Sequence, residues 1–240
     1  MSNDLYRCSF DSVAETYERA RPLYADDAVA WIAQRLPFEQ VLDLGAGTGK
    51  LTRQLVAAGA KVVAVEPGDE MRAVLERVVP GVRVLAGSAE AIPLSDGSFD
   101  TVTVGQAFHW FRTSEALAEM HRVLRPGGGF ALLWNVWDEH DPLLHAMGEL
   151  TNSMRPQESH GTDWRAHYDT SLFGPLEQRT FRQTRMVTAE SLVAWMASTS
   201  WVVTAPADER ARLEAEVRAL AGDGPVDVSL GTDVVVADRL

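Results

Sequence analysis

The sequence predicts an α/β protein built on a doubly wound, mostly parallel sheet. Up to Trp134, short apolar runs rich in β-branched residues alternate with segments of helical periodicity, which is typical of a parallel sheet with helices on both faces. The first apolar run leads into a glycine-rich turn, residues 41–49 (VLDLGAGTG). Glycines at such a junction let the chain turn sharply and come close to a ligand at the carboxyl end of the strand.

The expected elements follow this alternation in order. Strands are expected at Gln40–Leu44, Lys61–Glu66, Val82–Ala86, Phe99–Gly105 and Gly129–Trp134, with helices at Lys50–Ala58, Gly68–Val79 and Thr113–Leu124. Thr113 suits the N-cap of that last helix, because its hydroxyl can accept a backbone N–H, and Pro126-Gly127 should stop the helix. Later strands are expected at Leu176–Thr184 and Asp233–Asp238, and later helices at Ala189–Ser198 and Ala207–Ala221.

Composition narrows the classes of partner. The 240 residues carry a formal net charge of −12, so the Lys/Arg surplus that binds a phosphate backbone is missing and nucleic acid is not expected as a partner. No apolar run approaches the roughly 18 residues of a membrane helix, and the first residues lack a secretion pattern. The single cysteine, Cys8, excludes an internal disulfide. We therefore expect a cytoplasmic protein, either a monomer or a homodimer.

The spacing of the glycines separates the possible ligands. A dinucleotide fingerprint counted from Gly45 needs a third glycine at position 50, which is Lys50. A P-loop needs a glycine and a hydroxyl residue where the chain has Leu44 and Leu51. What remains is an acid, Asp43, in front of three alternating glycines. A carboxylate there suits a cationic or hydroxyl-bearing ligand and not a pyrophosphate.

Four segments and a following loop carry a resemblance to one enzyme family. They are residues 10–24 (FDSVAETYERARPLY), 41–51 (VLDLGAGTGKL), 65–67 with Met71, 89–111 (AEAIPLSDGSFDTVTVGQAFHWF) and the loop 124–128 (LRPGG). Together they make the chain resemble the class I S-adenosylmethionine-dependent methyltransferases, in particular the small-molecule branch with the trans-aconitate and ubiquinone-type enzymes. The resemblance implies S-adenosyl-L-methionine as cofactor, S-adenosyl-L-homocysteine as product, and a seven-stranded Rossmann-like sheet.

The resemblance also implies a subdivision of one methyltransferase domain. Residues 1–37 would form a helical cover, residues 38–135 the cofactor-binding core, residues 136–175 a lid, and residues 176–240 the C-terminal strands and helices. In this family the last two strands add antiparallel pairing at one edge of the sheet.

Cofactor-binding residues are implied at the ends of the first two strands. By resemblance, Asp43 helps to orient the methionine part of the cofactor beside Gly45, Ala46 and Gly47. Glu66, which is followed by Pro67, can accept hydrogen bonds from both ribose hydroxyls. Two uses remain open for Met71: its sulfur can lie on the adenine face, or its side chain can belong to the core.

Further positions are implied after the third and fourth strands. Ser88 and Ala89 would present backbone groups to the adenine edge. Glu90 either bonds the exocyclic amine or caps the next helix. Gln106 would border the methyl group. One helical face of the N-terminal segment would carry Phe10, Tyr17, Arg21 and Tyr24, until Pro22 perturbs the helix. By resemblance, Tyr17 and Arg21 would seal the pocket, and Arg21 would pair with the cofactor's carboxylate. The alternative is an ordinary amphipathic surface helix.

His109 is the candidate catalytic residue. Methyl transfer from a sulfonium is an in-line displacement, for which the protein supplies alignment, water exclusion and, where needed, a base. The histidine can deprotonate a hydroxyl or amine, hydrogen-bond a substrate carboxylate, or serve only as packing beside Trp110 and Phe111. Residues 138–141 (DEHD) have no register that would aim a metal-ligand set, and Cys8 lacks a neighbouring histidine, so neither a metal centre nor a cysteine nucleophile is expected.

The expected function is methyl transfer to a small-molecule acceptor, with oxygen of a carboxylate or hydroxyl favoured. Trp137, Trp164 and Trp201 suggest an aromatic lid or acceptor pocket, and Arg155, Arg165 and Arg185 suit a carboxylate-bearing acceptor. Methylation at carbon or nitrogen remains an alternative, and so does a non-catalytic protein that binds the cofactor to regulate a partner. The missing glycine at position 50 argues against NAD-dependent oxidoreduction.

Overall fold

The computed structural model describes residues 14–138, 140–153 and 163–240, which form two compact units. The sheet unit comprises Leu23–Asn135, Gly161–Phe181 and Thr232–Leu240. The helical unit comprises Met1–Pro22, Val136–His160 and Arg182–Gly231. The proposed subdivision of a single domain stays a prediction.

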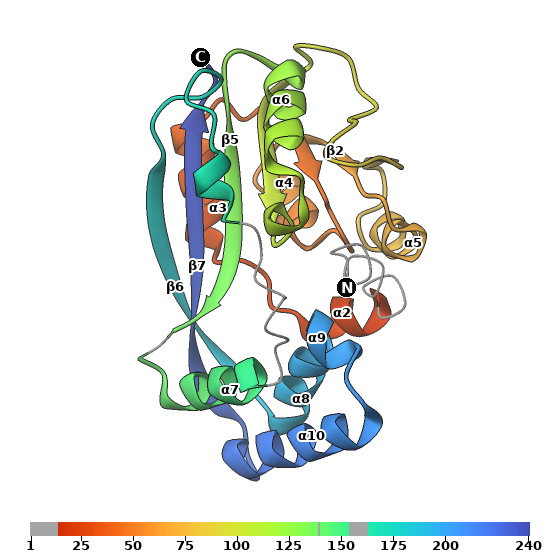
Figure 1. Cartoon of the computed structure of the whole chain (residues 1–240), viewed down its shortest axis with the longest axis vertical. Coiled ribbons are helices and arrows are strands. Elements are labelled where there is room, and N and C mark those ends of the chain that lie inside the picture. Colours follow the sequence, from red (N-terminus) through yellow and green to blue (C-terminus); the bar gives the residue numbers. More distant parts are fainter. Residues whose placement is uncertain (1–13, 139, 154–162) are drawn as a thin grey trace. The chain divides into compact units, whose positions relative to one another are not determined.

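Seven strands form one sheet in the order β3-β2-β1-β4-β5-β7-β6 (Figure 1). They are β1 (Gln40–Leu44), β2 (Lys61–Val65), β3 (Arg83–Leu85), β4 (Phe99–Gly105), β5 (Leu124–Trp137), β6 (Glu177–Val187) and β7 (Val226–Asp238). The pairs β1–β2, β1–β4, β2–β3 and β4–β5 are parallel, and β7 runs opposite to its neighbour β5. Strand order reverses beside β1, as in a doubly wound sheet, so the predicted α/β fold class is confirmed.

Helices connect the strands close to the predicted bounds. They are α2 (Ala14–Ala20), α3 (Asp26–Arg35), α4 (Lys50–Ala57), α5 (Asp69–Val78), η2 (Phe108–Trp110), α6 (Thr113–Val123), α7 (Pro142–Ser153), η3 (Trp164–His167), α8 (Ala189–Ala197), α9 (Ser200–Val203) and α10 (Ala207–Ala221). In α4 and α5 the apolar residues repeat at helical spacing, which explains the agreement with the sequence. None of the helices in the described part of the chain is both long and apolar enough to cross a membrane.

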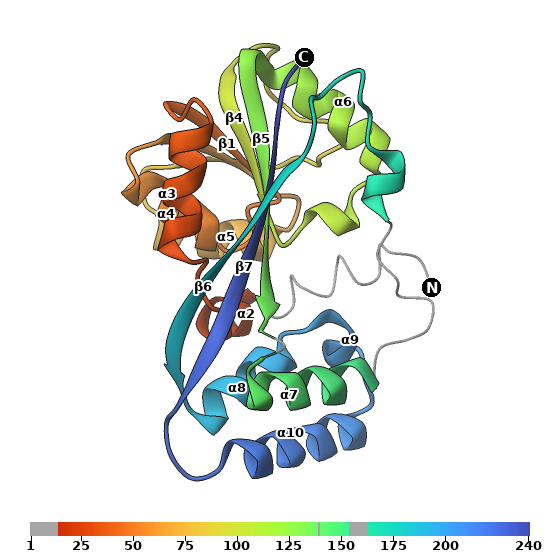
Figure 2. The same cartoon turned by 90° about the vertical axis from the view of Figure 1, so that its left-hand side faces the viewer.

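The sheet unit has a core on each face of its sheet. Along β5, Phe130 and Leu132 pack with the buried side of α6, whereas Ala131 and Leu133 pack with α3 and α4. This alternation follows from the two-residue period of a strand. Figure 2 accordingly shows α3 and α4 on one side of the sheet and α6 on the other.

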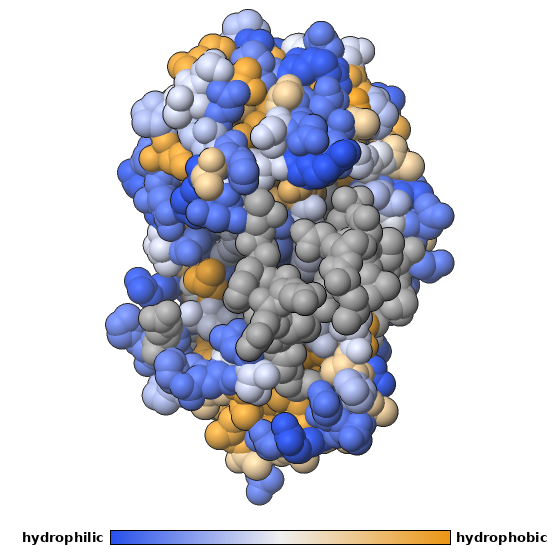
Figure 3. Space-filling view, in the orientation of Figure 1, coloured by the Kyte–Doolittle hydropathy of each residue, from blue (hydrophilic) through white to orange (hydrophobic). Residues whose placement is uncertain are grey.

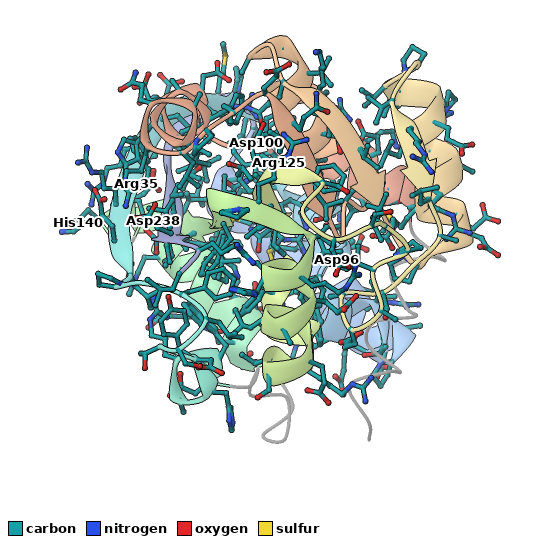
Figure 4. The ribbon with its side chains drawn as sticks, turned by 90° about the horizontal axis from the view of Figure 1, so that it is seen from above. Arg35, Asp96, Asp100, Arg125, His140 and Asp238 are labelled. Carbon is teal, nitrogen blue, oxygen red and sulfur yellow. The ribbon has the colours of Figure 1, made fainter. Side chains whose placement is uncertain are left out.

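Ion pairs join neighbouring elements of the sheet unit. The Arg35 guanidinium binds both carboxylate oxygens of Asp238, at 2.8 and 2.7 Å, and so ties α3 to β7. Arg125 pairs with Asp100 at 2.6 Å and ties β5 to β4. Figure 4 shows the two pairs, each with its arginine beside its aspartate. Asp238 holds the pKa of Arg35 above its usual value, as expected for a bidentate pair.

The helical unit has a separate apolar core. It is formed by α7, α8 and α10 with parts of β6 and β7, and Trp137 stacks on Trp195 at 4.9 Å between ring centroids. Thr188 and Ser191 form a capping box at the start of α8. On the face drawn in Figure 3, hydrophilic residues cover most of the visible surface, and a larger hydrophobic group lies around α10.

Several local predictions were wrong, including the start of the last strand, since β7 begins at Val226 and not at Asp233. Thr113 is the first helical residue of α6 and Arg112 holds the N-cap position; among the described residues the buried Thr113 hydroxyl has no partner. The helix α6 ends before Pro126, as expected, but the strand expected from Gly129 already begins at Leu124. The strand can pass through this segment because Gly127, with φ +81°, lets it bulge. The N-terminal helix was expected to continue until Pro22, but α2 ends at Ala20.

The early end of α2 keeps only part of the predicted shared face, since Arg21 still lies over the Tyr17 ring whereas Tyr24 lies outside it. Pro22 follows two residues later, and Arg21 and Tyr24 lie beyond the helix. Tyr24 instead belongs to a core of the sheet unit, where a Cβ on Gly105 would lie 2.5 Å from its hydroxyl. Phe10 and Cys8 lie outside the described residues.

Candidate functional site

The glycine turn between β1 and α4 has a left-handed backbone at Gly45, Gly47 and Gly49, with φ of +68°, +56° and +84°. Glycine is the residue that adopts this conformation without strain. The expectation that each missing Cβ makes room for a ligand needs correction. A Cβ on Gly45 would meet Ala107 at 2.9 Å, and one on Gly49 would meet Leu75 at 2.9 Å. Only Gly47 of the three faces open space.

Four backbone N–H groups of this turn bond within the protein. Those of Gly45 and Ala46 donate to the Val65 carbonyl at 2.8 and 3.2 Å, and that of Gly49 donates to the Ala46 carbonyl at 2.9 Å. The N–H of Gly47 donates to the Glu66 carboxylate at 2.9 Å. A phosphate cradle needs such N–H groups to point at the ligand. This turn therefore differs from a phosphate-binding loop.

Glu66 follows the last residue of β2 and is 9% exposed. Its Oε2 accepts the N–H of Gly47 and its Oε1 accepts the N–H of Gly68, both at 2.9 Å. Arg72 donates to the Glu66 carbonyl at 2.8 Å, which fixes the backbone there. The arrangement places an oriented, buried acid beside the glycine turn.

Asp43 is the last residue but one of β1 and is fully buried. Its Oδ2 accepts the Thr52 hydroxyl at 2.6 Å, and its Oδ1 accepts the Thr103 hydroxyl at 3.2 Å. Burial raises the pKa of the Asp43 carboxyl to about 6, although the two hydroxyl donors act in the opposite direction. Asp43 thus joins β1 to α4 and β4, and its surface is not exposed for a direct ligand contact.

The positions after β2 and β3 are buried or bonded. Met71 is 4% exposed in α5, which agrees with the core alternative for its side chain, and Ala89 is buried in the core facing α6. Ser88 forms a bridge with Ala91. The Glu90 carboxylate accepts the N–H of Arg112, the residue before α6, which is the contact that the capping interpretation predicts. Pro67 follows Glu66, and its carbonyl accepts from Arg72.

Gln106, after β4, is the one non-glycine residue with positive φ in the described ranges, at +58°. Its N–H donates to the Leu133 carbonyl at 2.8 Å, and its side-chain amide donates to the Asn135 carbonyl at 3.0 Å. Asn135 in turn accepts the Thr232 hydroxyl at 2.8 Å. Bonds to β5 therefore hold the end of β4 in a conformation that non-glycine residues seldom adopt.

His109 lies in η2, which begins two residues after Gln106. Trp134 on β5 donates its indole N–H to His109 Nδ1 at 3.4 Å, and the His109 ring lies 4.7 Å from the Trp110 ring. Ala107 and Phe111, on either side of η2, are the residues that approach Gly45. The structure therefore brings the segment around His109 against the glycine turn.

Other predicted residues lie elsewhere. Tyr17 and Arg21 belong to the helical unit, where the Arg21 guanidinium binds the Ser198 hydroxyl at 2.8 Å and lies over the Tyr17 ring. Their role at the cofactor stays a prediction. Trp164 lies in the sheet unit, whereas Trp137 and Trp201 lie in the helical unit. Arg165 lies over Trp164, Arg185 is part of β6, and Arg155 is outside the described residues.

The segment 138–141 has structural contacts. The Asp138 carboxylate accepts the Ser229 hydroxyl at 2.8 Å and pairs with Arg182 at 3.2 Å, and these bonds, with those from His140, hold its pKa below the usual value. Across the described ranges, no group of three or more His, Cys, Asp or Glu side chains is placed so that it could hold a metal ion.

Comparison with known proteins identifies the family. Residues 42–132, from β1 to β5, match the family model for a methyltransferase domain. An uncharacterized methyltransferase of Mycobacterium tuberculosis is 39% identical over 221 residues, which are 90% of this chain and 87% of that protein. The chain is a class I S-adenosylmethionine-dependent methyltransferase. The resemblance to the class I S-adenosylmethionine-dependent methyltransferases is confirmed at the level of that family.

Further matches show how far the likeness extends. The methyltransferase shares its fold with a solved structure from Anaeromyxobacter dehalogenans assigned to the type II methyltransferases, with a TM-score of 0.67, 24% identity, and 91% and 97% of the two chains covered. A ubiquinone/menaquinone biosynthesis C-methyltransferase of Rubrivivax gelatinosus is 41% identical over 97 residues, 40% of this chain and 39% of that protein.

Sequence reasoning missed several residues of the site. Thr52 and Thr103 carry the hydroxyls that bind Asp43, and Trp134 and Asn135 hold His109 and Gln106. Strand register offered one signal, since Thr103 is the partner of Asp43 across β1 and β4. Trp134 and Asn135 stand at the end of a predicted strand, but no local pattern indicates which neighbours they contact.

Proposed function

We propose that this methyltransferase binds S-adenosyl-L-methionine at the carboxyl ends of β1, β2 and β4 and transfers the methyl group to an oxygen of a small molecule. The favoured acceptors are a carboxylate or a hydroxyl, and the product cofactor is S-adenosyl-L-homocysteine. The turn after β1 and the acid after β2 would hold the methionine and ribose parts. Ser88, Ala89 and Met71 would lie on the adenine side, and Gln106 and His109 on the methyl side.

The observation that carries the proposal is the polarity of the glycine turn. Four of its N–H groups bond within the protein, and one of these, the N–H of Gly47, donates to the Glu66 carboxylate. A carboxylate beside the turn suits ribose hydroxyls and a cationic ligand, and it disfavours a pyrophosphate. A sulfonium nucleoside has both of these features. The Glu66 carboxylate would accept hydrogen bonds from the ribose hydroxyls.

The reaction asks mainly for positioning. The acceptor oxygen must attack the methyl carbon in line with the bond to sulfur, and the sulfur is already a good leaving group. In the protein, bonds to β5 fix Gln106 at the end of β4, and Ala107 and Phe111, on either side of η2, lie near Gly45 of the glycine turn. His109 would hydrogen-bond the acceptor or take its proton.

Titration calorimetry with S-adenosyl-L-methionine tests the cofactor site. Glu66→Ala should weaken binding roughly ten- to a hundredfold, because hydrogen bonds to a charged group are lost. The control is Glu76→Ala, which removes an exposed glutamate from α5 and should bind as the wild type does. Equal affinity of Glu66→Ala and wild type would contradict the site, and tight binding of a nicotinamide dinucleotide would contradict the function.

Turnover is tested with a panel of carboxylic acids, phenols, amines and quinols while S-adenosyl-L-homocysteine release is followed. We expect release with oxygen acceptors, and His109→Ala should lower kcat more than cofactor affinity. Carbon methylation is the second candidate, favoured by the partial likeness to the Rubrivivax gelatinosus C-methyltransferase. Release with quinols alone would replace the oxygen proposal with that one.

A further inference from the structure

The contact between His109 and Trp134 defines which ring nitrogen of His109 carries a proton. Trp134 Nε1 lies 3.4 Å from His109 Nδ1 with its N–H directed at that nitrogen. An indole nitrogen is a donor only, so Nδ1 must be the acceptor. A neutral imidazole then carries its single proton on Nε2. Protonation of Nδ1 would place two N–H groups against each other and break the contact.

The donor in this contact is held by packing. The Trp134 ring is stacked on Trp164, with 6.1 Å between the ring centroids and 14° between the planes. Trp164 is itself 6% exposed and meets Phe108 edge-on at 5.4 Å. Phe108 precedes His109 in η2, so the same aromatic cluster positions both partners of the hydrogen bond. The indole N–H is therefore oriented before any substrate arrives.

The consequence for chemistry depends on what each acceptor requires. When a hydroxyl is methylated, its oxygen forms a bond to the methyl carbon and its proton has to be taken up by a base. When a carboxylate is methylated, an oxygen lone pair forms the new bond, the carbon–sulfur pair returns to sulfur, and the carboxylate and sulfonium charges cancel. No proton leaves in the second case. An Nε2–H group can hold a carboxylate but cannot accept a proton.

We propose that Trp134 is a positioning residue that keeps the proton of His109 on Nε2, so that His109 acts as a hydrogen-bond donor to an anionic acceptor oxygen and not as a general base. This inference rests on the proposed function, because it concerns the acceptor side of that same site. It selects carboxylates over hydroxyls as acceptors. It also assigns to Trp134 a role that its place at the end of β5 does not reveal.

Nitrogen-15 spectra of histidine-labelled protein test the inference without any turnover. The chain has six histidines, and the signals of His109 are identified by their loss in His109→Gln. We expect a pyridine-like shift for Nδ1 and a pyrrole-like shift for Nε2. Trp134→Phe should abolish this preference, whereas Trp31→Phe, which removes another indole of the sheet unit, should preserve it. A proton on Nδ1 in the wild type would overturn the proposal.

Substitutions at His109 separate a donor from a base. The amide nitrogen of glutamine stands near the position of Nε2 and that of asparagine near Nδ1, and neither side chain is a base. His109→Ala and His109→Asn should lower kcat/KM for a carboxylate roughly ten- to a hundredfold, and His109→Gln should recover most of the loss. Trp134→Phe should lower kcat without changing the affinity for S-adenosyl-L-methionine. No recovery in His109→Gln would overturn the donor role.

The two levels of proposal fail in different ways. If the protein binds S-adenosyl-L-methionine but methylates hydroxyls in preference to carboxylates, the oxygen-methyltransferase proposal stands and the inference about His109 is overturned. If no acceptor yields product, the proposed function fails, and the nitrogen spectrum still decides whether Trp134 sets the protonation of His109.

Discussion

The turn after β1 and the segment after β4 lie on neighbouring parallel strands, and they reach their conformations by different routes. Three glycines bend the first, and its N–H groups bond to β2 and to the turn itself. The second contains Gln106, a non-glycine residue with positive φ, and depends on contacts from β5. The comparison shows that local residue choice shapes one half of the site and distant strands shape the other.

The two regions also differ in how they use charge. The β1 side carries Asp43, which is fully buried and bonded to two hydroxyls, and the buried acid Glu66. The segment after β4 has its polar groups in amides and rings, with Gln106 and His109 both held by β5. In the proposed function, the first region would bind the cationic nucleoside and the second would fix the geometry for transfer.

The largest effect is expected where the two regions touch. Gly45→Ala would place a Cβ 2.9 Å from Ala107 and 3.1 Å from Phe111 at a φ of +68°. Strain and overpacking together should lower the free energy of unfolding by about 2 to 5 kcal/mol. Urea denaturation measures this loss.

The matched control for that change is Gly47→Ala. It has a φ of +56° and nothing within 4 Å, so only backbone strain of about 1 kcal/mol is expected. Equal losses in the two variants would show that contact between the regions does not matter and that the backbone conformation alone explains the glycines.

A change at Asp43 sharpens the electrostatic side of the comparison. Its pKa is raised from 3.8 to about 6 by burial, so the folded state binds a proton that the unfolded state has released between these values. The stability that this group contributes is present below about pH 4 and is lost as the pH rises to about 6. The shift corresponds to about 3 kcal/mol. Asp43→Asn, neutral throughout, should lack this decline.

Thermal and urea denaturation of wild type and Asp43→Asn between pH 4 and pH 7.5 measure the difference. Asp27→Asn, at an exposed position in α3, serves as the control and should follow the wild-type profile. Parallel profiles for wild type and Asp43→Asn would mean that the Thr52 and Thr103 hydroxyls compensate the ionised carboxylate fully.

The smallest effect is expected at Gln106. Gln106→Ala keeps the unfavourable positive φ and loses the bond to the Asn135 carbonyl, which should lower the free energy of unfolding by about 1 to 2 kcal/mol. Gln106→Gly loses the same bond but adopts the conformation without strain, so its loss should be under about 1 kcal/mol. Thermal denaturation compares them. If the alanine variant were as stable as the glycine variant, the β4 side would not be strained.

The regular elements were predictable because their signals are local. The bounds of β1 and β4 agree with the prediction, since continuous apolar, β-branched runs between turn residues indicate buried strands. The same local rules failed where a neighbour intervened. Thr113 was predicted as an N-cap, yet the Glu90 carboxylate bonds the N–H of Arg112 just before the helix.

The sequence by itself determined the sheet, the glycine turn and the family, because apolar periodicity, positive-φ glycines and an acid in front of them are properties of contiguous residues. Tertiary structure alone decided what those residues do. Gly45 makes room for Ala107, Asp43 is enclosed by two threonines, and Trp134 selects the protonated nitrogen of His109. Each of these contacts joins residues from different strands or helices, and their distance and burial are set only when the sheet has assembled.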